Sequence, residues 1–182
     1  VHSDTNRTFE LAAGGIGVLH AHERQLNLYG GISGGSADSL MVFSVSGTKN
    51  NIMRLNAQNT YQGATQIVGQ AGDWGWTRLQ DVHNALPVTT VLHLGGPEDH
   101  VGYLDLYGRN QELAGLVRAS GSTVASERLS VYNSHGTAST LTLNIAAGTI
   151  NAFDGTIGKT TAGAGNQPWQ KGTNLGLVKT GE

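Results

Sequence analysis

The chain lacks cysteine and contains little proline and little charge. Its 182 residues include no cysteine and 3 prolines, and charged side chains make up 13% of the total. The absence of thiols excludes disulfide frameworks, thiolate zinc sites and cysteine nucleophiles. The 11 lysines and arginines, set against 13 acidic residues, provide no basic field for a nucleic-acid backbone, so no nucleic-acid partner is expected. No apolar run approaches the roughly 18 residues of a membrane-spanning helix, so no membrane-spanning segment is expected either.

Small and uncharged polar residues are abundant, whereas charged residues are few. Glycine contributes 27 residues, and threonine, serine and asparagine contribute 18, 12 and 13. Threonine favours strands, whereas serine, asparagine and glycine favour turns over helix interiors. Only residues 78–86 carry leucine and valine at helical spacing, which predicts one or two helical turns there. The composition as a whole predicts an all-β fold.

Short alternating apolar runs recur along the chain. The segment Leu-Asn-Leu-Tyr-Gly at 26–30 returns as Leu-Asp-Leu-Tyr-Gly at 104–108. A period of two predicts strands with one buried face, and the glycines that follow predict turns. We expect a solenoid of about eight coils with roughly 20 to 25 residues per coil. The side chains expected to point inward are Leu26, Leu28, Leu104, Leu106, Leu141 and Leu143.

No linker divides the chain. Its composition stays level from end to end, as one continuous repeat structure requires. We expect a single segment over residues 1–182, with an inserted loop at 69–88 where tryptophan, aspartate and proline interrupt the alternation. A second copy of the repeat begins near residue 153 and is not completed, so we expect a β-helix that is part of a longer array, truncated at both ends. Its open coil edges would pair with adjacent repeats or with other copies of the chain.

One motif points to a family. Residues 55–67 contain Asn-Thr-Tyr-Gln-Gly-Ala-Thr between two strand-like ends. This run resembles the autotransporter-associated β-strand repeat, and its flanks are similar to the longer cassette of that family over essentially the whole chain. The resemblance implies a right-handed parallel β-helix from the exported passenger region of a bacterial surface or secreted protein. It therefore implies an extracellular or cell-surface location.

Few polar residues suggest chemistry. Asn59, within the motif, is a candidate for a ladder of stacked side chains or an ordinary turn residue. His20 and His22 share one face of a predicted strand at a spacing that suits a metal ion, but no third ligand accompanies them, which favours ordinary surface histidines. The acidic residues are scattered, whereas polysaccharide cleavage needs converging carboxylates. We expect no metal, no cofactor and no catalytic site.

Trp74 and Trp76 are the candidate ligand-binding residues. Two indoles separated by one glycine in an extended loop lie on the same side and can stack on sugars. The alternative is that they fold back and cover the edge of a coil. The same two interpretations apply to Trp169.

Three classes of function follow from these expectations. The first is a structural or spacer segment of a large exported bacterial surface protein, which polymerises end to end through open coil edges. The second is an adhesive module that binds surface glycans through Trp74 and Trp76. The third is a polysaccharide-active enzyme. Low charge, abundant threonine and asparagine, and scattered acids favour the first class, so we expect a protein that is not an enzyme.

Overall fold

The computed structural model describes residues 2–47, 51–70, 75–158 and 174–181. Strands dominate this part of the chain, and its only helical element is a short 3-10 turn at Ser126–Arg128. The all-β prediction is therefore confirmed. Among the described residues, no helix is long and apolar enough to cross a membrane.

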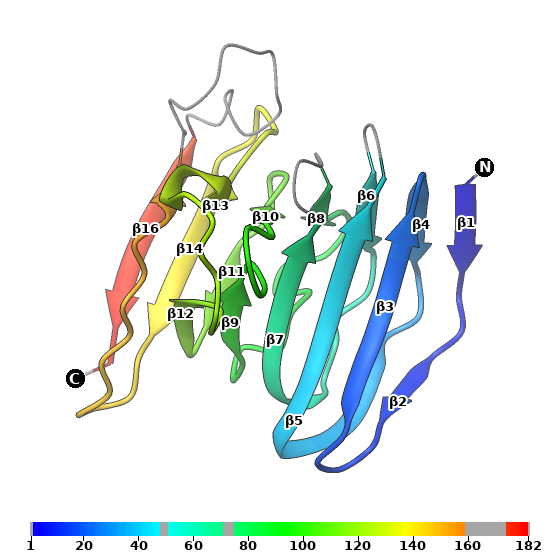
Figure 1. Cartoon of the computed structure of the whole chain (residues 1–182), viewed down its shortest axis with the longest axis horizontal. Coiled ribbons are helices and arrows are strands. Elements are labelled where there is room, and N and C mark those ends of the chain that lie inside the picture. Colours follow the sequence, from blue (N-terminus) through cyan, green and yellow to red (C-terminus); the bar gives the residue numbers. More distant parts are fainter. Residues whose placement is uncertain (1, 48–50, 71–74, 159–173, 182) are drawn as a thin grey trace.

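The strands form three parallel sheets that wind around a common core (Figure 1). The seven-stranded sheet contains, in spatial order, β1 (His2–Thr5), β4 (Gln25–Leu28), β6 (Ile52–Leu55), β8 (Trp76–Leu79), β10 (Gly102–Asp105), β13 (Leu129–Tyr132) and β15 (Thr156–Ile157). The six-stranded sheet contains β12 (Gly115–Arg118), β9 (Val91–Leu94), β7 (Gln62–Gly69), β5 (Ile32–Ser46) and β2 (Phe9–Leu11), with β3 (Ile16–His22) also paired to β5. The three-stranded sheet contains β11 (Gln111–Leu113), β14 (Ser139–Asn144) and β16 (Leu175–Thr180). Every pairing between these strands is parallel, so the predicted β-solenoid is confirmed.

Residues one coil apart lie in register. In the six-stranded sheet one continuous column runs through Val18, Val42, Gln66, His93 and Val117. Its steps are 24, 24, 27 and 24 residues. The coils are therefore at the upper end of the expected length or longer. The expected number of about eight coils is too high, because the longest sheet of the described residues holds seven strands.

The alternating leucines build the core. Leu28, Leu104, Leu106 and Leu141 are at most 2% exposed, as predicted. The two remaining members of the predicted set, Leu26 and Leu143, are partly buried and pack against the same core. The prediction of inward leucines is therefore confirmed. Its physical reason is that a strand places every second side chain on the same face.

The segment expected as an inserted loop is partly built into the solenoid. Residues 76–79, within the expected loop 69–88, form strand β8, which lies between β6 and β10. That part of the loop prediction is wrong because Trp-Thr-Arg-Leu pairs with a neighbouring strand on each side. The helical turn expected at 78–86 is also wrong, since Arg78 and Leu79 belong to β8 and no helix follows them in this segment.

Candidate functional site

Trp76 does not present a surface for sugars. It is 3% exposed and belongs to the hydrophobic core cluster. All four residues of β8 are buried, so side chains on both faces of this strand are covered. The burial of Trp76 agrees with a covering role, whereas Trp74 and Trp169 lie outside the described residues.

A buried carboxylate links three successive strands of the seven-stranded sheet. Asp105, at the end of β10, has no exposed surface. Its Oδ2 accepts hydrogen bonds from Nε of Arg78, at 2.9 Å, and from the Ser134 hydroxyl, at 2.7 Å. Its Oδ1 accepts from the backbone N–H groups of Tyr107, at 3.1 Å, and Ser134, at 3.0 Å. Arg78 comes from β8 and Ser134 follows β13, so one side chain joins three coils.

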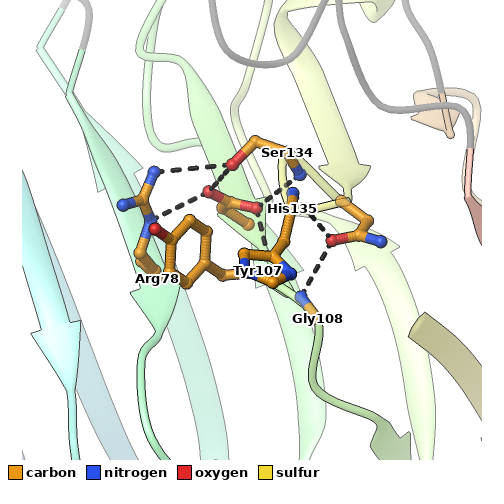
Figure 2. Close-up of polar contacts among 7 residues, drawn as sticks. Arg78, Tyr107, Gly108, Ser134 and His135 are labelled. Atoms are coloured by element: carbon orange, nitrogen blue, oxygen red, sulfur yellow. Dashed lines mark hydrogen bonds and ion pairs between the residues drawn. The ribbon is translucent and has the colours of Figure 1, made fainter. Parts of the chain in front are cut away.

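The ring of Tyr107 lies against Arg78, and His135 packs against that ring (Figure 2). The guanidinium carbon of Arg78 lies 3.8 Å from the centre of the Tyr107 ring, and His135 meets that ring edge-on with 4.9 Å between centroids. Tyr107 has a φ of 47°, which few residues other than glycine adopt. The bond from its N–H to Asp105 forms a tight turn and offsets the cost of this conformation. We define these residues, with Ser134, as the Arg78–Asp105 cluster.

A second turn of the same kind adjoins the Arg78–Asp105 cluster. Oδ1 of Asn133 accepts from the N–H of His135, two residues on, at 3.1 Å. The same oxygen accepts from the N–H of Gly108 on the preceding coil, at 2.9 Å. Both Asp105 and Asn133 therefore use their acceptor atoms to fix turns and to join coils.

The geometry of the Arg78–Asp105 cluster suits structure better than catalysis. Each carboxylate oxygen of Asp105 already accepts two hydrogen bonds, from Arg78, Ser134 and the turn backbone. These four bonds occupy the acceptor sites of the carboxylate with groups of the protein itself. Tyr132, at the end of β13, has a pKa well above its ordinary value. Burial is the larger cause and the nearby charge of Asp105 the second, so the hydroxyl of Tyr132 stays protonated.

Asn59 also joins coils, although not as part of a ladder of asparagines. Its Oδ1 accepts from the N–H of Ile32 at 2.8 Å, and its Nδ2 donates to the carbonyl of Ala85 at 2.6 Å. These partners lie on the preceding and following coils. Gln111, two coils further along, joins its coil to the preceding one, because its side-chain amide bonds both the N–H and the carbonyl of Leu86.

A chain of hydroxyl groups crosses the core beside the Asn59 motif. The Tyr61 hydroxyl contacts Thr65, which contacts Thr90 at 2.8 Å, and Thr90 donates to the carbonyl of Gly63 at 2.9 Å. A carbonyl only accepts, so the hydroxyls are directed from Tyr61 through Thr65 to Thr90. Burial strongly raises the pKa of Tyr61, which keeps its proton available as the first donor of the chain.

The outer face of β5, β7 and β9 carries a shallow groove. It has a volume of about 680 Å³ and adjoins a second hollow of about 440 Å³, with Ala37, Ala64 and His93 lining both. Partial burial lowers the pKa of His93, which is therefore neutral at pH 7. Among the described residues, no aromatic side chain other than this imidazole lines either hollow, so this part of the chain offers no indole or phenol ring there to stack on sugars.

The candidate metal and acidic residues do not converge into a larger site. His20 and His22 lie together on β3, as expected, with ring centroids 5.8 Å apart. Within the described ranges, no group of three or more histidine or acidic side chains is arranged to hold a metal ion. Asp154 forms an ion pair with Arg118, at 2.8 Å, on the surface.

Sequence reasoning missed the Arg78–Asp105 cluster. One signal was present: Asp105 replaces Asn27 when the unit at 26–30 recurs at 104–108. Its partner Arg78 lies 27 residues earlier, in register on the neighbouring strand.

Comparison with protein-family models, with curated proteins and with solved structures finds no match. The resemblance to the autotransporter-associated repeat family therefore stays a prediction.

Proposed function

We propose that this chain is a structural spacer, a rigid β-solenoid segment of an exported bacterial surface protein. The observation that carries the proposal is the direction of its buried polar bonds. Asp105, Asn59, Gln111 and Asn133 each bond groups on a neighbouring coil. In an enzyme or a binding protein, such polar side chains face the ligand. In this chain they hold neighbouring coils together.

The arrangement of the core supports the same proposal. One hydrophobic cluster extends from Leu11, on the first coils, to Leu141, near the last. The first and last strands, β1 and β16, lie at opposite ends of the stack (Figure 1). A load applied at the ends therefore passes through every coil in turn. The exported, cell-surface setting rests on the family resemblance.

Stretching a single molecule from its two ends tests the proposal. A coil of 24 to 27 residues extends by roughly 80–95 Å when pulled straight, taking about 3.3–3.6 Å per residue. Because each coil contacts mainly its neighbours, we expect resistance to load followed by release in steps of about one coil or a multiple of it. Extension at low force without discrete steps would contradict a load-bearing role.

A parallel screen distinguishes the alternative functions. An array of surface glycans tests adhesion, and a panel of polysaccharides tests hydrolysis, both with the unmodified chain. Specific glycan binding or sugar release would replace the spacer proposal, whatever the stretching result.

A further inference from the structure

A separate polar network lies on the outer side of β3 and β5. His20 of β3 pairs in register with Ser44 of β5, and His22 pairs with Ser46. Alternate residues of a strand point to one side, so these four side chains share a face. Both histidines are exposed to solvent, whereas Ser46 is 6% exposed. The imidazoles of this network therefore face solvent, whereas the hydroxyl of Ser46 is buried at the surface of the sheet.

The serines hold both imidazoles in place. Nδ1 of His20 lies 2.9 Å from the Ser44 hydroxyl, and Nδ1 of His22 lies 2.8 Å from the Ser46 hydroxyl. The rings stack, with 21° between their planes. A further contact of 2.9 Å joins Nε2 of His20 to Ser46. In metal-binding histidines an oxygen fixes one ring nitrogen and the other faces the ion. His22 has this arrangement, whereas His20 attains it once its Nε2 leaves Ser46.

We propose that His20 and His22 bind one late first-row divalent ion through their Nε2 atoms, with copper(II) bound most tightly. Neutral imidazole suits copper, nickel and zinc, and copper(II) binds most strongly among these ions at a given site. Nε2 of His20 exchanges its contact with Ser46 for the ion. No third histidine or acidic residue in the described part of the chain completes the site. Water or an external ligand therefore fills the remaining positions, and binding is reversible.

Copper(II) titration of the whole chain, followed by calorimetry and electron paramagnetic resonance, tests the site. Every sample carries His2→Gln, so that a histidine near the amino end of the chain does not contribute. We expect one equivalent of copper with two coordinated nitrogens. Ser44→Ala leaves both ligands but releases the His20 ring, and should weaken binding by about tenfold or more. His20→Gln and His22→Gln each remove a ligand and should weaken binding further than Ser44→Ala.

His83→Gln is the matched control, because His83 is also exposed but lies outside the pair. It should leave the affinity of the tight equivalent unchanged. Thermal melting of each variant without metal checks that its fold is intact. If the variant with both His20→Gln and His22→Gln binds copper as tightly as its parent, or if His83→Gln weakens binding equally, the site is not at this pair and the proposal is overturned.

Discussion

Replacing Asp105 with asparagine should destabilise the solenoid strongly. The substitution keeps the shape of the side chain but removes its charge and converts one acceptor into a donor. Four donors surround the carboxylate, namely Nε of Arg78, the Ser134 hydroxyl and two backbone N–H groups. Whichever way the new amide turns, its NH₂ faces two of these donors.

The magnitude follows from burial. Asp105 has no exposed surface, and the side chain of Arg78 is 11% exposed. Removing one partner of such a pair leaves an uncompensated buried charge, which costs about 3–5 kcal/mol. For a domain of this size each kcal/mol lowers the melting temperature by about 2–4 °C, so the expected decrease is roughly 6–20 °C.

Denaturant and thermal unfolding followed by far-ultraviolet circular dichroism measure this loss. Asp154→Asn is the matched control, because Asp154 also pairs with an arginine but its side chain is 61% exposed. Exposed pairs contribute about 0–1 kcal/mol, so the control should be nearly as stable as the unmodified chain. If Asp105→Asn loses no more stability than Asp154→Asn, the Arg78–Asp105 cluster does not hold the coils together.

Three further predictions concern single residues. Gly63→Ala should prevent or severely weaken folding, because Gly63 has a φ of 103° and an added Cβ would lie 2.1 Å from the Ser39 carbonyl oxygen; a soluble variant with an unchanged melting temperature would contradict this. Asn59→Ala should cost about 1–3 kcal/mol for each buried backbone group that it leaves unpaired, measured by urea unfolding, and a loss below about 0.5 kcal/mol would show that these bonds are dispensable. The hydrogen bonds from Arg118 lower the pKa of Asp154, so this pair stabilises the fold above the unfolded pKa of about 3.9 and stops doing so as the pH falls through the lower folded value. The small difference in urea midpoint between the unmodified chain and Asp154→Asn should therefore vanish in acid, and a difference that grows there would refute the assignment.

The fold could be predicted because alternating apolar residues in the sequence indicate strands with one buried face. Leu104 and Leu106 are separated by one polar residue and followed by Tyr107 and Gly108, a pattern that predicts a strand with an inward face and then a turn. The pattern could not show where both faces are covered. All residues of β8, β10 and β13 are buried, so neither face of these strands is exposed, and Trp76 and Arg78 fall in a strand that shows no alternation of buried and exposed residues.

The polar contacts between coils could not be predicted for a related reason. Asp105 finds Arg78 one coil earlier, and Asn59 finds its partners one coil away in each direction. These separations depend on coil length, which varies from 24 to 27 residues within one column of the six-stranded sheet. Without the register, no sequence spacing identifies which polar side chains meet.

The distance between spin labels at Val18 and Val117 tests the rigid solenoid most directly. Labels attached through Val18→Cys and Val117→Cys have no competing site, because the chain contains no cysteine. The two positions lie in one column, four strand spacings apart, which places their backbones about 19 Å apart. We predict a single narrow distance distribution consistent with that spacing, which broadens only when the chain unfolds in urea. A broad distribution in native buffer, extending well beyond that spacing, would contradict a rigid stack of coils.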